Sequence, residues 1–150
     1  MSSPVAIEVR RAFELPPEDE TSLEARGEMW ETVALPEGGG TSLWLFIYDH
    51  VLPPGYCNAA AGGLAIGSCL IGLRLTGYPA GALDMAYFHP PLHRVDGRPI
   101  PAVSELTLDG KQFQQWSRHY TPANPFRVGV DTLSTHLGVV DEWLAREVRR

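Results

Sequence analysis

Short apolar segments separated by proline- and glycine-rich turns are the feature of this sequence that most limits its fold. They occupy residues 30–33, 43–48, 69–75 and 83–88. Side chains in 69–75 alternate between two faces, as expected of a strand. Strands joined by short connections pair antiparallel, because a parallel pair needs a long crossover. The sequence therefore predicts a four-strand antiparallel meander.

A short helix is predicted before this meander, at about residues 17–26. Proline suits the first helical position, and the acidic run Glu18, Asp19 and Glu20 suits the positive end of the helix dipole. Gly27 supplies a C-terminal stop. The acidic run is expected to be exposed to solvent.

The last helix has the clearest pattern in the chain. Asp131 is predicted to be its N-cap. Apolar side chains follow at helical spacing, at Leu133, Leu137, Val140, Leu144 and Val148. An N-terminal helix, an antiparallel meander and a C-terminal helix together predict an α+β fold with helices packed against a sheet.

Two segments are ambiguous by pattern alone. Residues 1–12 are predicted to be an N-terminal arm or an edge strand, and residues 13–150 to form the domain. Residues 112–119 fit a helix and a strand equally well.

Composition narrows the classes of function. The net charge of −6 disfavours binding to nucleic acid, which needs a basic face, although arginines late in the chain leave room for a local basic patch. No apolar run has the length of a membrane helix, and the N-terminus lacks the pattern of a secretory signal, so a cytoplasmic location is expected. The two cysteines, Cys57 and Cys69, form no metal-type pair and are expected to be free thiols.

Several motifs occur in an order that resembles the ubiquitin-conjugating enzyme fold. Tyr78-Pro79 follows the third predicted strand, His89-Pro90-Pro91 follows the fourth, and Trp116 comes later. The sequence Trp-Ser-Arg-His at residues 116–119 and the sequence Gly-Val-Asp-Thr-Leu-Ser-Thr-His-Leu at 129–137 are similar to motifs of a prokaryotic branch of that superfamily. The resemblance covers roughly residues 13–147.

The resemblance implies a place in a modifier-conjugation pathway. Its partners would be a ubiquitin-like modifier, an activating enzyme and a deconjugating metalloprotease, and it implies no cofactor. The first helix would be the surface where the activating enzyme docks. In the superfamily, a cysteine carries the modifier as a thioester, and the Asn of a His-Pro-Asn motif stabilises the oxyanion.

This chain departs from the superfamily at both catalytic positions. Pro91 stands where the Asn is expected, and no cysteine follows Cys69. Two hypotheses therefore stay open. Either the protein carries the modifier through a non-cysteine site as an oxyester, acting as an acyltransferase, or it is a non-catalytic adaptor that binds the modifier or the activating enzyme.

Ser117 and His119 are the first candidates for a non-cysteine site. In an extended segment their side chains leave the same face, with Cα atoms about 6.6 Å apart, within reach of a hydroxyl-to-imidazole hydrogen bond. His119 would then act as the base. In a helix the two side chains would diverge. Arg118, between them, is predicted either to bind a carboxylate of the modifier or to form an ordinary ion pair.

Each of the other candidate residues has a structural explanation beside the functional one. His89 is predicted either to act in catalysis or to fix the loop by hydrogen bonds, and His93 to be catalytic or simply exposed. Trp116 is predicted to anchor the loop or to contact a partner. His89, His93 and His119 could also be interpreted as the zinc site of a metal hydrolase. Their spacing is not diagnostic and no Glu or Cys completes the set, so no metal is predicted. Cys57 is a weaker nucleophile candidate, and Cys69 is expected in the core.

Overall fold

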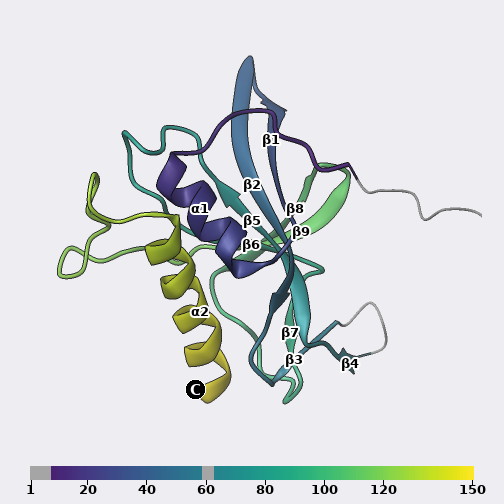
Figure 1. The fold of residues 1–150 in the computed structure, drawn as a ribbon. Coiled ribbons are helices and arrows are strands. Elements are labelled where there is room, and N and C mark those ends of the chain that lie inside the picture. The colour runs from purple at the N-terminus through teal and green to yellow at the C-terminus, as the bar shows by residue number, and fades with distance from the viewer. Residues whose placement is uncertain (1–7, 59–62) are drawn as a thin grey trace, which may run out of the picture.

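Two helices pack on one side of a curled six-stranded antiparallel sheet in the part of the chain that the computed structural model describes, residues 8–58 and 63–150 (Figure 1). The helices are α1 (Pro17–Arg26) and α2 (Leu133–Arg149). The large sheet contains β1 (Trp30–Glu37), β2 (Gly40–Val51), β5 (Ser68–Arg74), β6 (Ala86–His89), β8 (Val103–Leu108) and β9 (Lys111–Trp116). A small sheet contains β3 (Tyr56–Asn58), β4 (Leu64–Ala65) and β7 (His93–Arg94).

The predicted α+β class agrees with this architecture, but the predicted sheet was too small. The strand order of the observed large sheet is β1-β2-β5-β6-β9-β8, with every neighbouring pair antiparallel. The ambiguous residues 112–119 form most of β9, which adds to β6 and pairs with β8. A four-strand meander is therefore not confirmed as the complete sheet.

Gln114 explains why β9 could not be recognised as a strand. Its side chain is buried, although glutamine is usually exposed. The amide accepts from the Leu92 N–H at 3.1 Å and donates to the Leu92 carbonyl at 3.0 Å, and it also accepts from the Trp116 indole at 2.8 Å. These bonds satisfy a polar group in the core, so β9 lacks the apolar alternation that marks a strand.

The main core lies between the sheet and the helices. Sheet residues such as Leu45, Ile71 and Phe88 pack there with Leu137 and Leu144 of α2. Full burial of each such side chain contributes about 1.5–3 kcal/mol to folding. No helix in the described part of the chain combines the length and apolarity that crossing a bilayer requires.

The N-terminal segment joins the two edges of the curled sheet. Arg10 donates to Glu31 of β1 at 3.0 and 3.1 Å and to Asp109, in the β8–β9 turn, at 2.9 and 2.6 Å. A second apolar cluster, which includes Trp44 and Phe113, contains residues of the sheet and none of the helices. The division at residue 12 stays a prediction, since residues 1–7 lie outside the described residues. The backbone of Arg11 forms an isolated bridge to Thr32.

Asp19 corrects the expectation of a solvent-exposed acidic run. Its side chain is fully buried, between α1 and the start of α2. It accepts from the Leu133 N–H at 3.1 Å and from the Tyr78 hydroxyl at 2.5 Å. Asp19 thereby satisfies one of the N–H groups that a helix start leaves without an intrahelical partner.

The predicted N-cap of α2 was wrong by one residue. Thr132 is the N-cap, and its N–H donates to the Thr135 hydroxyl at 3.1 Å. Asp131 instead binds Arg127, through the Arg127 N–H at 2.7 Å and the guanidinium at 3.1 Å. Both side chains belong to the loop that leads into α2.

Replacing Asp19 with Ala should destabilise the fold by about 1–3 kcal/mol, because two donors lose a buried acceptor. The measurement is the free energy of unfolding in urea. Glu18→Ala is the matched control, since Glu18 occupies the same turn but is exposed, and it should change stability by no more than about 0.5 kcal/mol. Equal effects of the two substitutions would contradict the role given to Asp19.

The Arg10 link should make stability depend on acid. Hydrogen bonds from Arg10 lower the pKa of Glu31 to about 2. Because the folded pKa lies below the unfolded one, this contribution is present above about pH 4.5 and is lost as the pH falls toward 2. Arg10→Ala should remove that part of the pH dependence, measured as urea midpoints across this range, whereas Arg74→Ala at an exposed pair should leave it unchanged.

Candidate functional site

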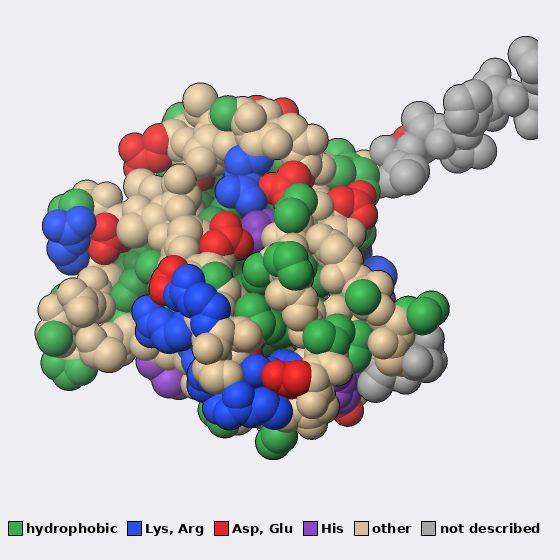
Figure 2. Space-filling view, turned by 90° about the horizontal axis from the view of Figure 1, so that it is seen from below, with side chains coloured by type: hydrophobic (Ala, Val, Ile, Leu, Met, Phe, Trp, Pro, Cys, Tyr) green, Lys and Arg blue, Asp and Glu red, His purple; other side chains and the backbone are tan. Residues whose placement is uncertain are grey.

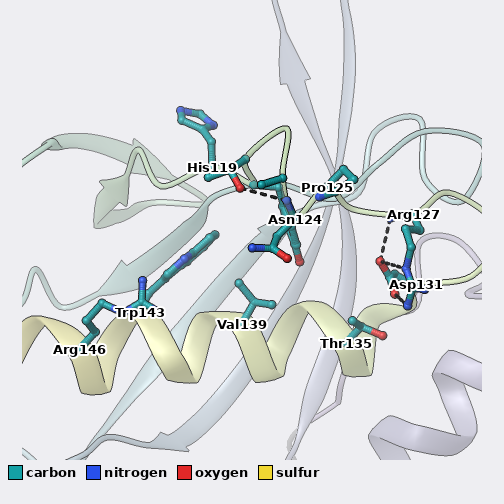
Figure 3. A pocket seen from close by; sticks show the side chains of 12 residues that line it. His119, Asn124, Pro125, Arg127, Asp131, Thr135, Val139, Trp143 and Arg146 are labelled. Carbon is teal, nitrogen blue, oxygen red and sulfur yellow. Dashed lines mark hydrogen bonds and ion pairs between the residues drawn. The ribbon is translucent and has the colours of Figure 1, made fainter.

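A groove runs along α2, between the helix and the segment that follows β9 (Figure 3). It consists of two clefts, of about 560 and about 390 Å³. They adjoin, because His119, Trp143 and Arg146 line both. The first cleft has a mixed lining, in which Tyr120 and Val139 are among the apolar residues. The second cleft is bordered by arginines.

His119, which lines this groove, is hydrogen-bonded to Asp84. His119 Nδ1 lies 2.6 Å from Asp84 Oδ2, and both side chains are about half exposed. An ionised carboxylate only accepts, so Nδ1 carries the proton in this bond and a neutral ring has Nε2 free to accept one. Figure 3 shows the His119 ring directed away from α2, while its backbone borders the cleft.

Ser117 lies two residues from His119 but is not bonded to it. The Ser117 N–H donates to the Ala102 carbonyl at 3.0 Å, and its hydroxyl accepts from the Gln115 amide at 3.3 Å. Among the described residues, the predicted Ser117–His119 hydrogen bond is thus absent. Ser117 is half-buried, directly after the last residue of β9.

Asp84 was missed because it stands inside an apolar run that was predicted to be a strand. In the structure β6 begins only at Ala86, and Met85 has a φ of 57°, a left-handed conformation unusual for a long side chain. Backbone outliers of this kind cluster at functional sites. A carboxylate interrupting an apolar segment was the signal available in the sequence.

An aromatic stack holds the His119 segment against α2. The Tyr120 hydroxyl and His136 Nδ1 are 2.8 Å apart, and His136 Nε2 lies 2.8 Å from the Met85 carbonyl. The carbonyl can only accept, so Nε2 carries the proton and Nδ1 accepts from Tyr120. The Trp143 ring lies 5.8 Å from the His136 ring. Burial lowers the pKa of His136 and raises that of Tyr120 to about 12.

Arg118 is held by a buried carboxylate. It donates to the Pro101 carbonyl at 2.7 Å and to Glu147 at 3.0 Å, and its guanidinium lies 4.7 Å from the centre of the Trp116 ring. Trp116 itself is fully buried against Phe88. Any contribution of Trp116 to partner binding would therefore act through the position of Arg118.

The other two candidate histidines, His89 and His93, lie away from this groove. His89 Nδ1 is 2.7 Å from the Gln112 carbonyl, and its ring packs against Phe113. His93 is exposed on β7 and lines a separate cleft of about 380 Å³. Neither borders the groove among the residues described. Their catalytic roles stay predictions, as do those of Ser117 and His119.

Both cysteines are poorly placed for acyl transfer. Cys57 and Cys69 are 7% and 5% exposed. Burial, with smaller contributions from Asp141 and Glu28, raises the pKa of the Cys69 thiol to about 12. A thioester carrier needs an accessible thiolate, so neither residue suits that role as the chain is folded.

A second histidine cluster escaped sequence reasoning altogether. His50 is 3% exposed, with Nε2 2.6 Å from Asp141 of α2 and Nδ1 3.2 Å from Arg26 of α1. Arginine can only donate, so Nδ1 accepts and Nε2–H donates to Asp141. The cluster ties both helices to the end of β2. No three potential metal ligands gather anywhere in residues 8–58 and 63–150.

Two helices on a curled antiparallel sheet are compatible with an E2-like domain. A family model described as Prokaryotic E2 family E matches residues 15–147, and the chain belongs to this family. The predicted membership of a prokaryotic branch of the ubiquitin-conjugating superfamily is thus confirmed. No curated protein and no solved structure matches the chain.

The family indicates a general role for the chain. A prokaryotic E2 domain belongs to a bacterial ubiquitin-like conjugation pathway and implies interaction with a modifier and an activating enzyme. The metalloprotease partner stays a prediction.

His136 should make the fold sensitive to mild acid. Because its folded pKa is lowered, the unfolded chain binds a proton more readily, and stability should fall as the pH drops below about 6.5. His136→Gln should remove this part of the pH dependence of urea unfolding, whereas His93→Gln, at an exposed site, should retain it. An unchanged pH profile in His136→Gln would contradict this assignment.

Proposed function

We propose that this protein receives a ubiquitin-like modifier from its activating enzyme and carries it as an oxyester on Ser117, with His119 as the base. The observation that carries the proposal is the Asp84–His119 pair, in which His119 lines the groove two residues from Ser117. A carboxylate on Nδ1 orients the ring and supports positive charge on it, as a base beside a hydroxyl nucleophile requires.

The chemical step is an acyl exchange. The Ser117 oxygen attacks the carbonyl of the activated modifier, so that a C–O bond forms and the bond to the activating enzyme breaks. The hydroxyl proton passes to His119 Nε2 and then to the leaving group. In the second transfer a target amine attacks the ester carbonyl, so that a C–N bond forms as the C–O bond breaks. The proton that the amine loses returns to the serine oxygen. Ser117 must exchange its Gln115 contact for His119 to begin this sequence.

The burial of both thiols supports a nucleophile other than cysteine. An alkoxide leaves less readily than a thiolate, so the ester should be longer-lived than a thioester would be.

A second function, the non-catalytic adaptor, is favoured by one observation. The Ser117 hydroxyl accepts from Gln115 instead of donating to His119, so the nucleophile and the base are not in contact. In that case the groove would bind the modifier or the activating enzyme without forming a covalent bond.

Incubation with modifier, activating enzyme and ATP should give an adduct that hydroxylamine cleaves and thiol reductants do not. Ser117→Ala should abolish it. His119→Gln should slow its formation about 100-fold, because general base catalysis contributes at least that much. Asp84→Asn should slow it less than His119→Gln does.

Lys111 supplies a clean control, because it is the only lysine in the chain. Lys111→Arg should keep the ester adduct. An adduct that resists hydroxylamine and disappears in Lys111→Arg would be an isopeptide and would refute the oxyester. Binding of the modifier with no adduct in any variant would identify an adaptor.

A further inference from the structure

We infer that the arginine-rich end of the groove binds an acidic segment of a partner protein, with an apolar side chain of that segment packed against Trp143. This inference concerns recognition and does not depend on whether Ser117 forms an ester. It rests on the charge, the geometry and the two linings of the groove.

Positive charge is concentrated where α2 ends. We call this surface the arginine patch, and it consists of Arg98, Arg118, Arg146, Arg149 and Arg150. Figure 2 shows basic side chains gathered on the face seen from below, where the C-terminal end of α2 lies. With buried Arg94 there are six arginines, against the three carboxylates of Asp96, Glu142 and Glu147, in a chain whose net charge is −6.

A buried carboxylate orders part of this patch in advance. Glu147, whose side chain is 3% exposed, accepts from Arg94 at 2.9 Å, from Arg118 at 3.0 Å and from Arg150 at 2.6 Å. The guanidinium groups at the surface are thus held in place before any partner arrives. Ordering them beforehand reduces the entropy that binding must overcome.

Other arginines of the patch have unused donors. Arg146 and Arg149 are 67% and 64% exposed, and Glu142 is the one carboxylate that the described residues supply to both. Each guanidinium has five N–H groups, enough for bidentate bonds to a further carboxylate. Arg146 also borders both clefts, so a carboxylate bound there lies within the groove.

The lining of the groove indicates which other side chains the bound segment carries beside its acidic residues. The cleft of about 390 Å³ is bounded by Pro101 and Trp143 as well as by arginines. The adjoining cleft continues along Trp143 to Val139 and Pro125. An extended peptide with acidic side chains at one end and an apolar side chain at the other therefore matches both halves.

Charge on the rest of the molecule favours a protein segment over nucleic acid. Outside the patch and its paired carboxylates the chain is strongly acidic. A nucleic acid would extend beyond the patch, where the acidic surface would repel its phosphates. A short acidic segment contacts only the groove.

The test is fluorescence anisotropy with a short fluorescein-labelled peptide that carries glutamates at one end and leucines at the other. It should bind the protein, and more weakly as salt is added. Combining Arg146→Glu with Arg149→Glu should weaken binding at least tenfold. Arg74→Glu, at an exposed arginine on β5, is the matched control and should bind like the parent chain. Ser117→Ala should also bind normally, which separates this result from the fate of the oxyester.

Peptide variants complete the design. Replacing the leucines with serine should weaken binding, and replacing the glutamates with lysine should abolish it. Equal binding by the parent and the doubly reversed chain would overturn the inference. So would tighter binding of a single-stranded oligonucleotide or of anionic lipid vesicles, either of which would assign the patch to a different class of partner.

Discussion

The buried carboxylate of Glu147 is the interaction on which the arrangement of the groove depends. It joins α2 to Arg118 in the segment after β9 and to Arg94 in β7. Burial alone would raise the pKa of this carboxyl, but hydrogen bonds from Arg150 and Arg94 outweigh that effect, and the pKa lies below its ordinary value. Because removal of one partner would leave buried charge without compensation, the three elements are coupled in position.

Trp116 connects the position of the candidate site to that of the sheet. Its indole is fixed by Gln114 at the end of β9, and Phe88 packs at its edge. Ser117 is the next residue, so its position follows from that of β9, which lies between β6 and β8 in the large sheet. His119 is held independently, by Asp84 on the segment before β6 and by the neighbouring Tyr120–His136 contact. Ser117 and His119 are thus held in place by different contacts.

Sequence reasoning succeeded where local rules decide the structure. The bounds of α1 follow from prolines at its start and Gly27 at its end, and α2 follows from its apolar spacing. It failed where a distant partner decides. Asp19 is buried only because the start of α2 and Tyr78 supply donors. Gln114 is a core residue because a loop leaves the backbone groups of Leu92 to be satisfied.

In the candidate site, too, local features could be predicted and distant contacts could not. Its motif at residues 116–119 was visible in the sequence and led to the right family. The distant partners of that motif were not visible, since Asp84 and Glu147 reach it through folding. Arg118 was predicted as either a ligand for a carboxylate or a member of an ion pair, and in the structure it pairs with Glu147 and still borders the groove.

Peptide mapping of the trapped adduct tests the central claim most directly. Trypsin releases residues 112–118 as one peptide, Gln-Phe-Gln-Gln-Trp-Ser-Arg, in which Ser117 is the only side chain with a hydroxyl, thiol or amine. A carrier that uses Ser117 predicts that mass spectrometry finds the C-terminal remnant of the modifier on this peptide. A remnant found on any other peptide of the chain would contradict the account.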